Sequence, residues 1–529
     1  MSIAAPSAET AWLLHHVLGF DAMAESDTVA VLEEATRTAE GLFEPLNRDG
    51  DRIGSRLVDG EVHPPPGFAE AYRAYAEAGW VGIAASPDHG GQGLPHVLAI
   101  AASEPPASAN LALSLCPMLT QDAIALLQTH GTSDQQARLM FPMIAGTWTG
   151  TMCLTEPQAG SDLAGVRTRA LPDGDGFRIS GQKIFITWGE HGMSDNILHM
   201  VLARLPDAPA GSAGISLFAV PKFLADGARN AVRCLSLEEK LGIHASPTCV
   251  MEFAGARGEM VGPPNRGLAC MFAMMNAARL GVAMEGVAMA ERAFRRAADF
   301  AAQRMQGGAA IDQHPDVRRM LWTMRALALG GRLLTLHAAM HADSPRGALL
   351  IPVAKAWSTD AGVEAASLGV QVHGGMGFIE ETGAAQHLRD ARITPIYEGT
   401  NGIQALTLLH RGLLRDQGAA AAALFDEIEA EPAIPHPLRR AAEAARAAAD
   451  FLRHADARAA DAGATPFLQI IGTLTAAWLC ARIVRHPAAP PAARAAGQLF
   501  LDQILPRTHA HAAALAAPTP ALVGADPIA

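Results

Sequence analysis

The sequence predicts an α+β protein with several domains, ordered along the chain as helical, β, helical and helical. Three observations predict this organisation. The chain of 529 residues is too long for one hydrophobic core and suggests about three or four domains. Apolar residues recur at helical spacing toward both ends, and a central stretch instead alternates as β-strands do. We therefore expect domains at residues 1–150, 151–262, 263–415 and 416–529, the second being a β-barrel or β-sandwich.

The first domain is predicted to be helical. Its helical patterns cover residues 8–46, 67–78 and 97–146. Within the last of these, Gly131 is typical of a helix stop and Ser133 of an N-cap. The turn-rich link before it contains GGQG at residues 90–93. Because no strand precedes this motif and its spacing differs from a dinucleotide fingerprint, it indicates a turn rather than a phosphate-binding loop.

The second domain is predicted to consist of strands. FRISGQKIFIT at residues 177–187 alternates apolar and polar side chains, and Ser180 and Gly181 in its middle indicate the turn of a hairpin. Further strand patterns lie at residues 196–205, 214–222 and 249–256. Prolines and glycines separate them, as expected of a small all-β domain.

Long helices are predicted from Gly267 onward. An apolar stripe that includes Met271, Met274 and Met275 indicates core packing, although methionines also line ligand-facing surfaces. Further helices are predicted over residues 314–342, 348–373, 437–461, 466–485 and 490–515.

Composition and charge exclude several classes of function. The net charge is −12 without any block of Lys or Arg, which argues against binding to nucleic acid or to anionic membranes. We expect neither a secretory signal nor a membrane span, because no basic segment precedes the first apolar run and no run reaches about 18 residues. The six cysteines lack paired spacing, and His509 and His511 lack further ligands, so we expect a cytoplasmic protein without disulfides or metal.

The stretch RITPIYEGTNGIQ, residues 392–404, contains the first candidate for chemistry. Glu398 stands just before residues that break regular structure, and an apolar helical pattern resumes at Ile403. We expect Ile396 and Ile403 to face inward around the carboxylate. A carboxylate in an apolar pocket has a raised pKa and can act as a general base near neutral pH. From this stretch alone, a solvated loop glutamate is the alternative.

A second candidate is the loop MCLTEPQAGSDLAG, residues 152–165. Its polar groups and turn residues are Thr155, Gly160, Ser161 and Asp162. Backbone N–H groups and hydroxyls in such a loop can bind a ring carbonyl or phosphate oxygens. The alternative is an ordinary turn closed by the Asp or Ser side chain.

A third candidate is the strand KIFIT, residues 183–187. Phe185 and Thr187 are two residues apart, which places them on one face of a strand. They could offer a flat apolar surface and a hydrogen-bond donor to the same planar ligand. Taken alone, the pattern also fits an ordinary strand.

Together these motifs resemble the flavin-dependent acyl-CoA dehydrogenases. TEPQAGSD, GQKIFIT, a long helix with Arg279, QVHGGMGF and IYEGTNGIQ follow in the family's order, over about residues 70–415. SAN at 108–110, GTMCLTEP, NILHMVLARLP, HPDVRRML and LRDARITPIYEGTNGIQ resemble the subgroup that includes 3-methylmercaptopropionyl-CoA dehydrogenase. That subgroup has an extra C-terminal helical domain, which residues 416–529 resemble. The resemblance implies an N-terminal helical domain, a β-domain and a C-terminal four-helix bundle, with FAD between the last two.

The resemblance also implies which residues bind FAD. Phe185 would lie against the isoalloxazine ring and Thr187 near its N5 atom. At the polar edge of the ring would lie Leu154 and Thr155, and near the flavin or the CoA would lie Ser161. Beside the phosphates and adenosine of the cofactor would lie Thr400 and Gly402. The residues that contact the FAD of a neighbouring subunit, in a dimer or tetramer, would be Arg304, Gln371, Gly374 and Gly375. The loop after Arg304 is shorter than in many members and lacks their aromatic residue.

By the same resemblance Glu398 is the catalytic base. It would take an α-proton from an acyl-CoA thioester while the β-hydrogen leaves as hydride to the flavin, and electron-transfer flavoprotein would then accept the electrons. The Glu398 N–H would help to stabilise the enolate. Some members place the base before the arginine that matches Arg279, but Ala278 here cannot accept a proton. The implied substrate-binding residues are Ser161, Arg279, Tyr397 and Gly399.

The acyl group stays open between 3-methylthiopropanoyl and other short or medium chains. An alternative within the same fold is an oxidase that reduces O₂ directly. A further alternative is a DNA-binding flavoprotein, because the tail contains several arginines. A scaffold without activity is disfavoured by the presence of Glu398. His373, beside two glycines, is interpreted as a packing residue rather than a base or ligand.

Overall fold

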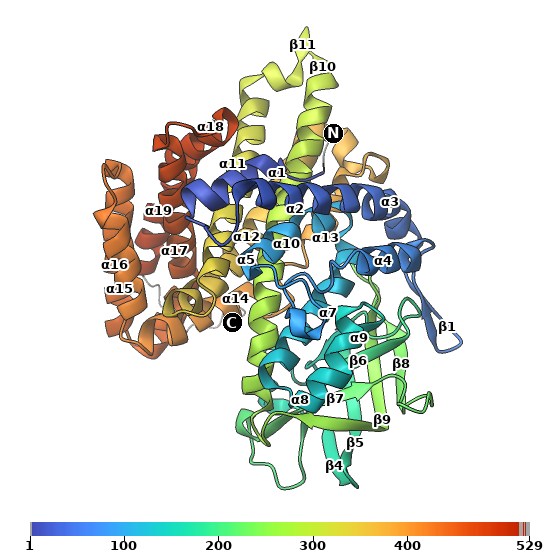
Figure 1. Ribbon diagram of the computed structural model, residues 1–529. Helices are drawn as coiled ribbons and strands as arrows, with labels where there is room; N and C mark the ends of the chain where they lie inside the picture. The colour runs from blue at the N-terminus through green and yellow to red at the C-terminus, as the bar shows by residue number, and fades with distance from the viewer. Residues whose placement is uncertain (1–2, 518–521, 523, 525–529) are drawn as a thin grey trace. The chain divides into compact units, whose positions relative to one another are not determined.

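The computed structural model, drawn in Figure 1, describes residues 3–517, 522 and 524. The chain divides into two compact units. Unit 1 comprises Met1–Thr36, His96–Ser108 and Arg279–Ala529, and unit 2 comprises Arg37–Pro95 and Ala109–Ala278. The long helix α10, Gly267–Gln303, begins in unit 2, and its residues from Arg279 onward belong to unit 1.

Unit 1 is almost entirely helical. Besides α10, its elements are α1 (Ser7–Trp12), α2 (Glu25–Thr38, whose last two residues belong to unit 2), α5 (His96–Ala102), α6 (Glu104–Ala109, whose last residue belongs to unit 2), β10 (Met305–Gln306), β11 (Ala309–Ala310), α11 (Pro315–Met340), α12 (Pro345–His373), α13 (Ala384–Ala391), α14 (Asn401–Thr407), α15 (Ala419–Ala430), α16 (His436–His454), α17 (Ala457–Arg485), α18 (Pro491–Leu499) and α19 (Arg507–Ala516). Helices α11 and α12 pack against each other, and α16, α17 and α19, orange to red in Figure 1, lie side by side.

Unit 2 combines short helices with a sheet. Its helices are α3 (Glu44–Ile53), α4 (Phe68–Glu77), α7 (Leu111–His130), α8 (Ser133–Gln135) and α9 (Phe141–Ile144). Its strands are β1 (Arg56–Val58), β2 (Glu61–His63), β3 (Trp148–Cys153), β4 (Arg169–Asp173), β5 (Gly176–Thr187), β6 (Asn196–Arg204), β7 (Ile215–Pro221), β8 (Val232–Leu237) and β9 (Thr248–Val261).

The main sheet has seven strands in the order β3-β6-β4-β5-β9-β7, with β8 paired to β9 and β6 paired also to β7. β3 runs parallel to β6, and β5 runs antiparallel to β9. A single residue pair, Arg169 with Arg204, joins β4 to β6. The hydrophobic core of this sheet includes Ile179, Val201 and Phe218. The predicted order of helical, strand and helical regions is confirmed, whereas the barrel and the four-helix bundle stay predictions.

The predicted hairpin turn at Ser180 and Gly181 is wrong. β5 continues through both residues, and the hairpin turn instead lies between Asp173 and Gly176. A register shift against β9 after Ile179 absorbs the local irregularity. Gly181 is needed for close approach rather than for a turn, since a Cβ there would lie 2.4 Å from the Thr168 hydroxyl.

Two predicted helix boundaries are also wrong. Thr132, not Ser133, is the N-cap of α8, because its hydroxyl accepts from the Gln135 N–H in a complete capping box. In the tail, Pro466 lies inside α17, and the break between helices falls earlier, where Asp456 caps the start of α17. A proline does not end a helix when neighbouring helices hold the remaining turns in place.

Within the described residues, α7, α10 and α17 are long and apolar enough to cross a membrane by length and composition. The expectation that no stretch reaches this length is therefore wrong. Between 61% and 83% of each apolar window is buried inside the protein, so most of this apolar surface packs against other parts of the chain.

Buried ion pairs join α10 to other helices of unit 1. Glu291 on α10 accepts from Arg325 and Arg332 of α11, each at 3.0 Å. Arg332 also donates to Glu104 of α6 at 2.7 Å, and Arg325 pairs with Glu9 of α1. Burial alone would raise the pKa of Glu291, but the arginine charges outweigh it and lower this pKa to about 2.

A buried ion pair in unit 2 ties the loop after β3 to strand β5. The Lys183 ammonium donates to Glu156 at 2.8 Å and to the Leu154 carbonyl at 3.0 Å. Glu156 also accepts from the Thr168 hydroxyl at 2.6 Å. Burial opposes ionisation of Glu156, yet the lysine and these hydrogen bonds lower its pKa to about 2. The TEP and KIFIT motifs are thereby held together, although 27 positions separate Glu156 from Lys183 in the sequence.

We predict that Arg332→Met destabilises unit 1 by about 3–5 kcal/mol, because two buried carboxylates lose their shared partner. Urea denaturation near neutral pH measures this change. The control is Arg319→Met on the same helix, which removes an exposed ion pair with Asp316 and should cost about 0–1 kcal/mol. Equal destabilisation by the two substitutions would contradict the structural role of the network.

We predict that Lys183→Met destabilises unit 2 by about 3–5 kcal/mol near neutral pH. The Glu156 pKa is lowered, so its stabilising contribution is present above the ordinary value of 4.5 and is lost as pH falls toward about 2. The difference between wild type and variant should therefore shrink across that window. The control Arg233→Met removes an exposed partner of Glu252 and should cost only about 0–1 kcal/mol.

Candidate active site

The loop with Glu398 connects α13 to α14 and covers residues 392–400. The Thr400 side chain ends it by accepting from the Ile403 N–H at 3.3 Å, which caps α14. The expectation that Ile396 faces inward is wrong, because this residue is 47% exposed. Residues 393–396 form a tight turn instead of continuing the helical spacing, and this turn directs Ile396 outward.

The backbone at Glu398 is strained and is held by side chains from two helices. Glu398 has a φ of 54° and Gly399 a φ of 88°, both in the left-handed region. Such a conformation costs a residue with a side chain about 1–3 kcal/mol. The Lys355 ammonium of α12 donates to the Gly399 carbonyl at 2.9 Å and to Asn401 at 3.0 Å. Gln404 of α14 donates to the Glu398 carbonyl at 3.1 Å.

The pKa of the Glu398 carboxyl group is set by two opposing effects, burial and the charges of two cations. Burial raises its pKa to about 7, while the charges of Lys355 and Arg279 act to lower it. Burial also lowers the pKa of Lys355 to about 8 and that of Arg279 to about 10. At neutral pH the carboxyl group is thus divided between its ionised and neutral forms, which suits a general base.

A second buried acid lies next to this group. Glu285 of α10 is 3% exposed, and its Oε2 accepts a hydrogen bond from the hydroxyl of Tyr397, the residue before Glu398. Burial raises the pKa of Glu285 to about 7, the hydrogen bond from Tyr397 opposes this, and the charge of Glu398 adds to it. The site therefore contains two acidic groups that titrate in the same pH range.

The predicted FAD residues of unit 2 lie on the loop after β3 and at the end of β5. Leu154 and Thr155 are partly buried, and Ser161 is exposed. Phe185 is 58% exposed, with a φ of 60°, at a bulge in the pairing of β5 with β9. Thr187 follows, partly buried. An exposed aromatic ring two residues from a hydroxyl group on the same strand has the chemistry that an isoalloxazine ring requires, so these residues fit FAD.

The other predicted FAD residues belong to unit 1. Thr400 and Gly402 follow Glu398 directly, and Gly402 is exposed. Arg304 directly follows the last residue of α10, and this helix extends roughly 36 Å from Arg279 to Gln303, given a rise of about 1.5 Å per residue. The structure thus does not bring this residue to the Glu398 site of its own chain. The remaining members of this group, exposed at the end of α12, are Gln371, Gly374 and Gly375.

His373 occupies a packing position at the end of α12. Its ring stacks on Phe300 with 4.4 Å between the ring centroids, and its Nδ1 lies 2.7 Å from the Gly369 carbonyl. In the loop of residues 152–165, Asp162 accepts from the Ala164 N–H at 2.9 Å, which forms the ordinary turn weighed as an alternative for that motif.

Glu285 and Lys355 were not among the residues that the sequence motifs indicated. Each is a single charged residue in an otherwise apolar helical stretch, LGVAMEGVAM and LLIPVAKAW. Charged residues are seldom fully buried unless they are paired, so such isolated charges could have indicated a functional cluster. The partners are distant in sequence, because 112 residues separate Glu285 from Tyr397.

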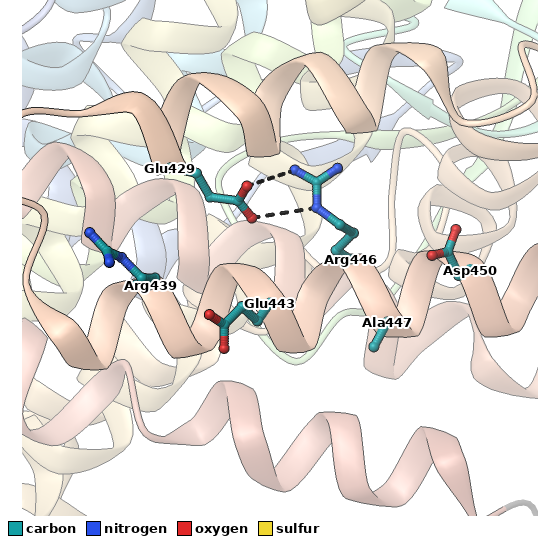
Figure 2. A pocket seen from close by; sticks show the side chains of 6 residues that line it. All are labelled: Glu429, Arg439, Glu443, Arg446, Ala447 and Asp450. Carbon is teal, nitrogen blue, oxygen red and sulfur yellow. Dashed lines mark hydrogen bonds and ion pairs between the residues drawn. The ribbon is translucent and has the colours of Figure 1, made fainter.

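An open pocket of about 510 Å³ is lined by residues of α15 and α16 (Figure 2). Its lining residues, between positions 429 and 450, come after all the predicted site residues in the sequence. Figure 2 shows Arg446 of α16 bonded to Glu429 of α15 across one side of it. Its other lining residues are Arg439, Glu443, Ala447 and Asp450. None of the predicted site residues lines this pocket.

Comparison with known proteins identifies the chain in three consecutive parts. Acyl-CoA dehydrogenase domain models match the N-terminal domain at residues 55–147, the middle domain at 151–256 and the C-terminal domain at 265–413. The chain is 47% identical over 494 residues to 3-methylmercaptopropionyl-CoA dehydrogenase of Ruegeria pomeroyi, which covers 85% of this chain and 84% of that protein.

Solved structures agree with this assignment. A chain described as the electron transferring flavoprotein of Acidaminococcus fermentans aligns with 27% identity and a TM-score of 0.67, over 75% of this chain and 100% of that one. The acyl-CoA dehydrogenase of Bacillus anthracis complexed with FAD shares the fold, with 19% identity and a TM-score of 0.78 over 94% of this chain and 90% of that one. This chain belongs to the acyl-CoA dehydrogenase family of FAD-dependent oxidoreductases.

Proposed function

We propose that this protein removes the α- and β-hydrogens of an acyl-CoA thioester to give the 2-enoyl-CoA, with Glu398 as the base. The observation that supports this most is the carboxyl group of Glu398, whose pKa burial raises to about 7 beside Lys355 and Arg279. Such a group is ionised often enough to accept a proton near neutral pH and basic enough to hold it.

The residues around Glu398 would direct the proton transfer. Lys355 fixes the left-handed turn through the Gly399 carbonyl, and its charge with that of Arg279 keeps the carboxylate available. By the family resemblance, the Glu398 N–H would donate to the thioester oxygen and stabilise the enolate. Tyr397, Gly399 and Ser161 would contact the substrate.

FAD would be held by the residues that the resemblance assigns to it. In unit 2, Phe185 offers an exposed ring, and Thr155 and Thr187 offer hydrogen-bond groups. In unit 1, Thr400 and Gly402 are available beside the Glu398 loop. Bound FAD supplies the oxidant that accepts the β-hydrogen as hydride.

For the substrate we propose 3-methylthiopropanoyl-CoA, or another short or medium acyl-CoA. The 47% identity to the Ruegeria pomeroyi enzyme, named for 3-methylmercaptopropionyl-CoA, supports this choice. For the acceptor we propose electron-transfer flavoprotein, supported by the structural similarity to the Acidaminococcus fermentans chain. We place this activity in the cytoplasm.

We also propose a dimer or tetramer. Arg304 follows the end of α10, which extends roughly 36 Å from Arg279 to Gln303, so its assigned contact with FAD would be made to a neighbouring subunit. Beside Gly374 and Gly375 the chain exposes Met376, Phe378 and Ile379, with Phe378 86% exposed. A second subunit would cover this apolar segment.

The tail favours an enzyme over the DNA-binding alternative. Arg446 pairs with Asp426 and Glu429, and Arg482 and Arg485 both pair with Glu431. Arginines that are paired with carboxylates present little net positive charge to phosphates.

We predict that Glu398→Gln retains FAD but slows bleaching of the flavin by acyl-CoA about 10²–10⁴-fold, because the amide cannot accept the proton. Stopped-flow absorbance of the FAD-loaded protein measures the rate. Glu77→Gln, an exposed glutamate on α4, serves as the matched control and should bleach normally. Undiminished bleaching in Glu398→Gln would remove this residue from the role of base.

We predict turnover of 3-methylthiopropanoyl-CoA when a dye or electron-transfer flavoprotein is supplied, and little oxygen consumption without them. A panel of acyl-CoA thioesters assayed at equal concentration measures the preference through kcat/KM. Rapid oxygen consumption with no added acceptor would indicate an oxidase instead. A panel in which longer chains are clearly preferred would contradict the proposed substrate.

A further inference from the structure

We propose that Glu285 is a positioning residue that shares one proton with Glu398 in the resting enzyme, the two carboxyl groups being coupled through the Tyr397 segment. This inference rests on the proposed role of Glu398 as the base. It assigns a function to a buried acid that the general-base mechanism by itself does not require.

The geometry around Glu285 supports this pairing. Glu285 lies on the same helix as Arg279, and its Oε2 accepts from the hydroxyl of Tyr397, whose peptide bond leads directly to Glu398. Within the described residues, its Oε1 is buried without a hydrogen-bond partner. A buried carboxylate with one unpartnered oxygen is costly as an anion, so a proton on Glu285 relieves that cost.

The charges that face this pair come from several elements. Lys355 of α12 acts on both carboxyl groups and Arg279 of α10 acts on Glu398. The negative charge of Glu398 in turn raises the pKa of Glu285. Further charges act on the neighbours of the pair: Asp360 of α12 acts on Lys355, Asp390 of α13 on Tyr397, and Arg411 after α14 on Arg279. Both carboxyl groups have a pKa of about 7, and like charges in one pocket release their protons in two separate steps.

Sharing a proton has a consequence for catalysis. When Glu285 is ionised, its charge increases the proton affinity of Glu398 and makes it a stronger base. When Glu398 accepts the α-proton, the negative charge beside Glu285 disappears and Glu285 is more easily ionised. The pair thus limits the change of charge in the pocket during the reaction, while the α-proton itself ends on Glu398.

Glu285→Gln tests the inference, because an amide keeps the shape and can still accept from Tyr397 but cannot ionise. In the FAD-loaded wild type, the bleaching rate should rise with pH as Glu398 ionises. Without its repelling neighbour Glu398 ionises more readily, so this rise should move to lower pH by about one unit. Glu443→Gln, exposed on α16, is the matched control and should leave the profile unchanged.

Infrared titration of the FAD-loaded enzyme without substrate gives a second readout that is independent of turnover. Wild type should show two carboxylic-acid bands that titrate near neutral pH, and Glu285→Gln should lose one and move the other to lower pH. If Glu285→Gln fails to fold, Tyr397→Phe decides. Loss of the hydroxyl should move the Glu285 band to higher pH, and a Glu285 that stays neutral longer should let the Glu398 band move to lower pH. An unmoved Glu398 band overturns the inference.

The outcomes separate this inference from the proposed function. A wild-type enzyme that acyl-CoA never bleaches contradicts the proposed function, and the infrared titration still tests the pair. A wild type that bleaches normally, together with a Glu285→Gln profile that is unchanged or moved to higher pH, overturns the inference alone.

Discussion

Helix α10 contains charges that are buried, and the need to neutralise them fixes the surroundings of the candidate active site. Glu291 is held by Arg325 and Arg332 of α11, and these arginines reach on to Glu9 and Glu104. A buried charge without its partner is costly, so the helices can pack in few other ways. Because α10 is fixed in this way, Arg279 and Glu285 stay beside the loop that contains Glu398.

Buried charges also stabilise the strained backbone at the candidate site residues. Glu398 adopts a left-handed backbone that its side chain disfavours, and Lys355 offsets the cost by bonding to the next carbonyl. In unit 2, Lys183 and Glu156 hold the loop after β3 against β5, close to the left-handed Phe185. In both units a buried lysine stabilises a backbone that would otherwise relax away from the geometry the site needs.

The local sequence pattern predicted some helices and strands correctly and others wrongly, and each error has a physical reason. The long helices and the strand block were predictable, because their apolar periodicity matches the faces that become buried. The turn expected at Ser180 and Gly181 is absent, because pairing on both sides of β5 and contact with Thr168 outweigh the local preference of glycine. Pro466 likewise lies inside a helix that packing against other helices maintains.

The sequence by itself determined the family, because TEPQAGSD, KIFIT and YEGTNG are each a run of consecutive residues and follow one another in the family's order. It also indicated Glu398, whose neighbours break regular structure before an apolar helix. Only the tertiary structure decided what surrounds that carboxylate. Glu285 and Lys355 are 113 and 43 positions from Glu398 along the chain. Electrostatic effects depend on distance in space and on burial, and the order of neighbouring residues in the sequence determines neither of these.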